Sequence, residues 1–179
     1  MIIGPPLKNG GHCFFMKPAG IKALIFDWGD TVMRDYPDLP GPMYTWPHVE
    51  AIHGIQEVLE TVFHSYNCII ATNAGCSDTE AMRKALRRIE FEKYFNYFFS
   101  SKDLGYEKPD PRFFDEICCQ TGFKPLECMM IGNSYEKDIT GAKKAGMLTV
   151  FFNENNLVIN TEYADFVINN MQQLKEIIC

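Results

Sequence analysis

The 179-residue sequence contains no apolar run near the roughly 20 residues that a membrane-spanning helix requires. It has no CxxC pair, and its seven cysteines are odd in number and irregular in spacing, unlike a disulfide framework. Its 17 Lys and Arg are outnumbered by 23 Asp and Glu, so the net charge of −6 offers no general attraction for a polyanion. We therefore expect neither a membrane nor a nucleic acid among its partners.

The first 20 residues also lack the pattern of a signal peptide. They hold Pro, Gly and Lys where an apolar segment of about 7 to 15 residues would be needed. We therefore expect a cytoplasmic protein whose thiols are reduced. The chain is predicted to consist of an N-terminal arm, residues 1–20, and one compact domain, residues 21–179, which is long enough to bury a core without disulfides or metal.

Short apolar runs alternate with amphipathic segments along this domain. The runs predict buried strands at residues 21–26, 67–71, 97–100, 128–131, 148–152 and 166–168. The amphipathic segments predict helices at 49–63, 77–89, 111–121 and 136–145, the second of which begins with a capping box of Ser77 and Glu80. This alternation predicts an α/β fold, a three-layer Rossmann-like parallel sheet with helices on both faces.

Polar residues collect at or just beyond the ends of the predicted strands. The clusters are residues 27–31, Thr72 with Asn73, Lys108, and Asn133 with Asp138. Ligands of open α/β sheets bind at the carboxyl ends of the strands, so these clusters can converge on one crevice. Carboxylates, a hydroxyl, an amide and one lysine suit a divalent cation and a phosphate, although each cluster taken singly is also typical of turns and helix caps.

Four stretches in this order resemble the motifs of the haloacid dehalogenase-like hydrolase superfamily: IKALIFDWGDTVM, IIATNAG, GYEKPDPRFF and MMIGNSYEKDITGAKKAGM. The resemblance covers residues 21–153. It implies a hydrolase with a Rossmann-like core that cleaves phosphate monoesters with the help of Mg²⁺. It also implies that Asp27 is the nucleophile, whose carboxylate attacks phosphorus and forms an aspartyl-phosphate.

The resemblance assigns the other polar residues as well. Thr72 and Asn73 would bind the phosphate, helped by backbone amides at a helix N-terminus. Lys108 would contact substrate and neutralise charge on Asp27 and on the phosphate. Asp138 would complete the magnesium site or orient Lys108. The candidate metal-binding positions are Asp27, Gly29, Asn133 and Asp138.

Two positions depart from the family's phosphatase pattern. The usual first motif has a second Asp two residues after the nucleophile, which protonates the leaving oxygen, and this chain has Gly29 there. The neighbouring Asp30 is a candidate substitute acid, or else it hydrogen-bonds backbone in the turn. Asn133 stands where the family has a metal-binding Asp, so we expect weaker magnesium binding.

The spacing of the motifs leaves no room for a substantial cap domain, because predicted elements and a proline-rich loop over residues 33–47 already fill the intervals. We therefore expect an open site, a small phosphorylated substrate or a phosphorylated macromolecule, and a monomer or homodimer. Two alternatives remain open from the sequence. One is a phosphate-binding regulatory module with little or no turnover, and the other is a dehalogenase or a phosphonate-cleaving enzyme of the same superfamily.

Overall fold

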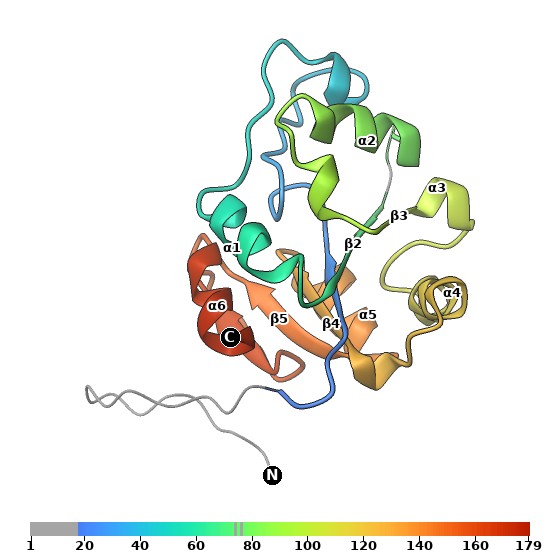
Figure 1. The fold of residues 1–179 in the computed structure, drawn as a ribbon, viewed down its shortest axis with the longest axis vertical. Helices are drawn as coiled ribbons and strands as arrows, with labels where there is room; N and C mark the ends of the chain where they lie inside the picture. The colour runs from blue at the N-terminus through green and yellow to red at the C-terminus, as the bar shows by residue number, and fades with distance from the viewer. Residues whose placement is uncertain (1–17, 74, 76) are drawn as a thin grey trace.

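The structure is a computed structural model that describes residues 18–73, 75 and 77–179 (Figure 1). Residues 1–17, most of the predicted arm, lie outside the described residues, so the predicted division at residue 20 stays a prediction. No helix in the described part of the chain is long and apolar enough to cross a membrane.

Six parallel strands form one sheet, in the order β3-β2-β1-β4-β5-β6. The strands are β1 (Ala23–Phe26), β2 (Asn67–Thr72), β3 (Tyr97–Ser100), β4 (Cys128–Gly132), β5 (Leu148–Phe152) and β6 (Phe166–Ile168). From β1 the chain builds the sheet outward through β2 and β3, then returns to the other side of β1 at β4. This reversal opens a crevice at the carboxyl ends of β1 and β4, where open α/β sheets bind ligands.

Helices cover both faces of the sheet, so the predicted three-layer α/β fold is confirmed (Figure 1). The α-helices are α1 (Ile55–Val62), α2 (Thr79–Arg87), α3 (Ser101–Leu104), α4 (Pro111–Thr121), α5 (Gly141–Lys144) and α6 (Leu174–Ile178). Short 3₁₀ turns lie at Met43–Thr45, Glu92–Tyr94, Pro125–Glu127 and Met171–Gln173, and a π-helix covers Tyr135–Thr140. The sequence patterns missed α3 and α6, which are too short to show a clear period.

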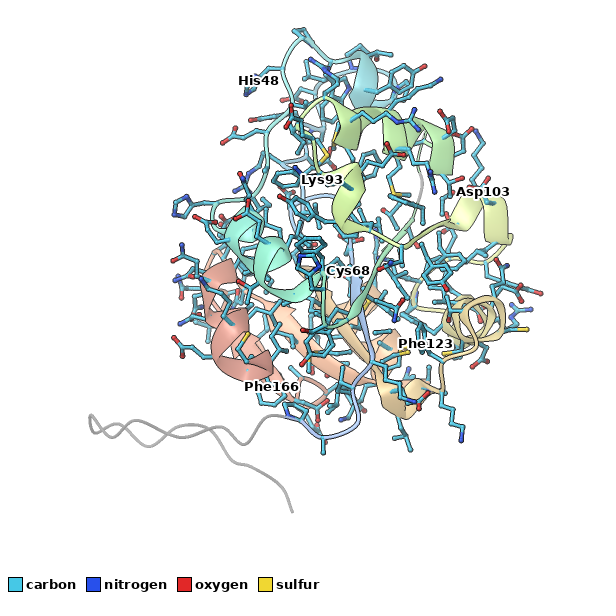
Figure 2. The ribbon with its side chains drawn as sticks, in the orientation of Figure 1. His48, Cys68, Lys93, Asp103, Phe123 and Phe166 are labelled. Carbon is cyan, nitrogen blue, oxygen red and sulfur yellow. The ribbon has the colours of Figure 1, made fainter. Side chains whose placement is uncertain are left out.

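Alternate residues of β1 enter two separate hydrophobic clusters. Leu24 and Phe26 pack with α1, α2 and α6, whereas Ala23 and Ile25 pack with α4 and α5. Cys68 lies inside the molecule beside α1, while His48 and Asp103 lie at its periphery (Figure 2). Burial raises the pKa of the Cys68 thiol to about 12, as expected for a cysteine that packs as a small apolar residue.

The helix predicted over residues 49–63 is wrong in its first half. Met33 and Ala51 form an isolated antiparallel bridge, the Arg34 amide donates a 2.8 Å hydrogen bond to the Glu50 carbonyl, and the helix starts only at Ile55. Gly54, with φ 82°, makes the left-handed turn that precedes α1. Val49 and Ile52 are buried nevertheless. Their apolar spacing therefore predicted burial correctly and helix incorrectly.

Two other helix starts differ from the sequence prediction. The helix predicted over residues 77–89 is capped by Asp78, whose carboxylate accepts a 2.9 Å hydrogen bond from the Ala81 amide, in place of the predicted Ser77 and Glu80 box. The helix predicted over residues 136–145 divides into the π-helix and α5. The wider π turn lies directly after the crevice at β4, and this segment carries Asp138.

Candidate active site

Asp27 lies immediately after β1, at the crevice between β1 and β4. Its backbone amide donates a 2.9 Å hydrogen bond to the Ile131 carbonyl of β4, which anchors the residue to both strands. The side chain is largely buried, and its Oδ1 accepts a 2.6 Å hydrogen bond from the Lys108 ammonium. The predicted nucleophile therefore lies at the carboxyl end of β1 with a cation beside it.

Lys108 is almost fully buried, with 3% of the residue exposed. Its ammonium donates to three acceptors. These are Asp27 Oδ1 at 2.6 Å, Asp138 Oδ1 at 2.7 Å and the Ala71 carbonyl at 2.9 Å. Burial lowers the pKa of Lys108, but the charges of Asp138 and Asp27 outweigh this effect and raise it above its usual value. Lys108 is therefore a fixed positive charge between two carboxylates.

Asp138 accepts hydrogen bonds through both of its carboxylate oxygens. Oδ1 accepts from Lys108, and Oδ2 accepts a 3.0 Å hydrogen bond from the Ser134 amide. Burial raises its pKa to about 6, with Lys108 opposing the shift and the charge of Asp27 adding to it. These contacts fit the predicted role of orienting Lys108, and direct metal binding by Asp138 stays a prediction.

The backbone of Lys108 is held by the side chain of Asn73. Asn73 Nδ2 donates to the Lys108 carbonyl and Asn73 Oδ1 accepts from the Lys108 amide, both at 2.8 Å. Asn73 thus positions Lys108, while its predicted contact with phosphate stays a prediction. Ala74, the other amide predicted to contact phosphate, lies outside the described residues. Thr72 ends β2, and its hydroxyl donates a long 3.5 Å hydrogen bond to the Asn73 carbonyl, which a phosphate oxygen could replace.

The loop that carries Lys108 packs against Gly141, the first residue of α5. A Cβ at this position would lie 2.9 Å from Pro109 Cα and 2.7 Å from Phe114 Cε2, which is closer than packed atoms tolerate. We expect Gly141→Ala to lower the free energy of unfolding by about 1–3 kcal/mol and to displace Lys108, reducing any catalytic rate as well. Urea unfolding checks this, with the exposed Lys144→Ala on the same helix as the control; equal midpoints would contradict it.

Asn133, another predicted metal-binding position, lies near Asp27 on the side of Thr31. The Thr31 hydroxyl lies between Asp27 Oδ2, at 3.4 Å, and Asn133 Oδ1, at 3.3 Å. Among the described residues no group of three or more His, Cys, Asp or Glu could hold a metal ion. The donors predicted beside Thr31 are therefore the Asp27 carboxylate and the Asn133 amide oxygen, and a contribution from the Gly29 backbone stays a prediction. These oxygen donors fit Mg²⁺, which often binds one or two carboxylates and keeps several waters.

Asp30, the predicted substitute acid, has partners within its own turn. Its φ of 52° places it in the left-handed region, and its Oδ1 accepts 3.2 Å hydrogen bonds from the Arg34 guanidinium and from the Asp35 amide. Arg34 in turn forms two hydrogen bonds to Glu154, at 2.8 and 2.9 Å. This geometry matches the turn-stabilising alternative, and catalysis by Asp30 stays a prediction.

Sequence reasoning missed Asp35, which lies next to Gly29 in space. A Cβ at Gly29 would lie 3.5 Å from the Cβ and 3.6 Å from Oδ2 of Asp35. Asp35 is exposed, but partial desolvation and the charge of Asp30 raise its pKa, and the charge of Asp27 adds to the shift. No motif in the sequence pointed to this residue, because only the path of the loop brings it back to residue 29.

Comparison with known proteins agrees with this geometry. Residues 32–152 match the sequence model of a family described as haloacid dehalogenase-like hydrolase, a segment that starts after Asp27 and includes Thr72, Lys108 and Asp138. A glyceraldehyde 3-phosphate phosphatase from Methanothermobacter thermautotrophicus is 32% identical over 99 residues, covering 52% of this chain and 44% of the relative. The pyrimidine 5'-nucleotidase PynA from Streptococcus pneumoniae is 31% identical over 115 residues, covering 63% and 47%. The chain thus spans less than half the length of these curated relatives.

Solved structures show the same architecture. An uncharacterized protein from Listeria monocytogenes serotype 4b superposes with a TM-score of 0.76 at 26% identity, covering 87% of this chain and 96% of that one. A HAD phosphatase from Thermococcus onnurineus has a TM-score of 0.74 at 20% identity, with coverages of 88% and 98%, a likeness of fold alone. The family match spans more than half of the chain. The chain therefore belongs to the haloacid dehalogenase-like hydrolase family.

Proposed function

We propose that the protein is a magnesium-dependent phosphate monoester hydrolase that acts through an aspartyl-phosphate at Asp27. The observation that carries this proposal is the buried lysine between two carboxylates, with Lys108 bonded to Asp27 and to Asp138 at the carboxyl ends of β1 and β4. A nucleophilic carboxylate must approach a second anion, the phosphate. A fixed ammonium beside it lowers the repulsion between the two.

In the first half of the reaction, the Asp27 carboxylate attacks phosphorus. A bond forms between its oxygen and phosphorus, the bond to the leaving oxygen breaks, and its electron pair stays on that oxygen. Lys108 balances the charge that builds on the phosphoryl oxygens, and Thr72, at the end of the neighbouring strand, offers its hydroxyl to one of them. In the second half, water attacks the same phosphorus, releasing inorganic phosphate and restoring Asp27.

Magnesium would be held by Asp27, the Gly29 carbonyl and Asn133, and would supply positive charge to the phosphoryl group. Asp138 would act indirectly, by holding the Lys108 ammonium in place. With a single carboxylate among its ligands, the site is expected to bind magnesium weakly.

The substrate is proposed to be a small phosphorylated molecule, or a phosphorylated macromolecule that reaches an open site. In the described residues, no domain is inserted between β1 and β2 or between β3 and α4. Two relatives are named for small phosphorylated substrates, glyceraldehyde 3-phosphate and pyrimidine nucleotides. A cytoplasmic location and a monomeric or homodimeric state stay predictions.

Hydrolysis of 4-nitrophenyl phosphate, measured with magnesium and with EDTA, tests the proposed function. This ester has a good leaving group and demands little from an acid. We expect turnover with magnesium and its loss with EDTA. Binding of phosphate or magnesium without turnover would favour a regulatory module, whereas metal-independent release of halide from a haloacid would favour a dehalogenase.

Asn133→Asp is expected to tighten magnesium binding, because it adds a second carboxylate beside Asp27. The magnesium concentration for half-maximal turnover should fall on the order of tenfold. Asn155→Asp is the matched control, since it adds the same charge on an exposed residue of the loop after β5. An equal change in both variants would mean that general charge, and not a ligand at residue 133, sets the affinity.

A further inference from the structure

Asp35 lies in van der Waals contact with the position that a Cβ at residue 29 would occupy. We propose that Asp35 is a catalytic residue that protonates the leaving-group oxygen, so that an acid from the loop after β1 replaces the one absent at Gly29. This inference rests on the proposed phosphatase function. It concerns a residue outside the motifs on which the family resemblance depends.

The geometry of residue 29 carries the argument. A Cβ there would lie 3.5 Å from the Cβ, 3.6 Å from Oδ2 and 3.7 Å from Cγ of Asp35, so the whole Asp35 side chain runs past that position. All three distances are ordinary van der Waals contacts. The Asp35 carboxyl group therefore lies beside the point from which a side chain on residue 29 would extend, two positions along the chain from the nucleophile Asp27.

The loop holds Asp35 in this place through its neighbours. The Asp35 amide donates a 3.2 Å hydrogen bond to Asp30, which also accepts from Arg34, and Arg34 is bound twice to Glu154 after β5. Asp30 is thus a positioning residue whose oxygen is engaged with Arg34 and with the backbone. These hydrogen bonds keep Asp30 in the turn and anchor the backbone of Asp35, whose side chain lies beside Gly29.

The proton balance of the reaction follows from this arrangement. As the oxygen of Asp27 bonds to phosphorus and the ester bond breaks, the leaving oxygen takes a proton from the Asp35 carboxyl group and departs as an alcohol. Asp35 is then a carboxylate. When water attacks the aspartyl-phosphate, Asp35 accepts a proton from that water, and phosphate leaves with Asp27 restored. Each turnover returns both residues to their starting state.

Leaving-group dependence tests the proposal. Phenyl phosphate and 4-nitrophenyl phosphate have similar shapes, but phenolate is the more basic leaving group and needs a proton more. We expect Asp35→Asn to lower kcat for phenyl phosphate on the order of 10²-fold, and kcat for 4-nitrophenyl phosphate far less, with KM little changed. Asp38→Asn, an exposed aspartate of the same loop, is the matched control and should behave as the unchanged protein.

A double variant separates catalysis from folding. Gly29→Asp in the Asp35→Asn background should restore most of the phenyl phosphate rate, because the φ of Gly29 lies outside the left-handed region and a Cβ fits there. Equal losses on both esters, or no rescue, would overturn the role of Asp35. A selective loss in Asp30→Asn and not in Asp35→Asn would assign the acid to Asp30. Absence of magnesium-dependent turnover in the unchanged protein would instead overturn the proposed function, and the role of Asp35 with it.

Discussion

Asp27→Asn is expected to abolish hydrolysis of 4-nitrophenyl phosphate, with a fall in kcat of ~10⁴-fold or more. The amide is nearly the same size as the carboxylate but is a poor nucleophile, so the covalent intermediate cannot form. The fold should persist, because Lys108 keeps its hydrogen bonds to Asp138 and to the Ala71 carbonyl. Initial rates at saturating magnesium and a urea unfolding curve measure the two effects.

Asp38→Asn serves again as the control for this substitution, since the same chemical change on an exposed loop residue should leave the rate unaltered. Turnover that persists in Asp27→Asn within tenfold of the unchanged protein would show that another group attacks phosphorus. It would also remove the aspartyl-phosphate from the proposed mechanism.

Lys108→Met is expected to lose stability and activity together. Methionine keeps much of the length of lysine but carries no charge, which leaves Asp27 and Asp138 buried near each other without a cation. Breaking a buried pair in this way typically costs about 3–5 kcal/mol of unfolding free energy. Loss of the fixed charge beside the phosphate should lower kcat on the order of 10²- to 10³-fold.

A double variant identifies the origin of the instability in Lys108→Met. Adding Asp138→Asn removes one of the two unpaired carboxylates, so part of the lost stability should return while activity stays low. Lys144→Met, on an exposed position of α5, is the control for the substitution itself. Equal unfolding midpoints for Lys108→Met and the unchanged protein would show that the buried ion triad contributes nothing to the fold.

Local patterns were sufficient for most of the secondary structure. The bounds predicted for β3, β5, β6 and α4 coincide with those of the structure, because each is a short apolar or amphipathic segment between clear breaks. The segment at residues 49–53 shows where such patterns fail. Val49 and Ile52 have helical spacing, yet tertiary pairing with the loop at residues 32–34 holds them extended, and Gly54 delays the helix.

The arrangement of the site was likewise predictable from the sequence only in part. The positions of Asp27, Thr72 and Lys108 near one crevice could be expected, since parallel strands bring their carboxyl ends to one edge of the sheet. The hydrogen-bond partners of Asp138 could not be predicted, because they depend on how distant segments pack. Only the folded chain shows that its two carboxylate oxygens accept from Lys108 and from the Ser134 amide.

The sequence by itself therefore determined the α/β class, the order of the strands along the chain and the residues available for phosphate chemistry. Those properties follow from short-range periodicity and from residues next to strand ends. Tertiary structure alone decided that Asp138 contacts Lys108, that Asp30 is bonded within its turn and that Asp35 returns to Gly29. These placements depend on the course of loops, which contacts between distant segments determine and local sequence does not encode.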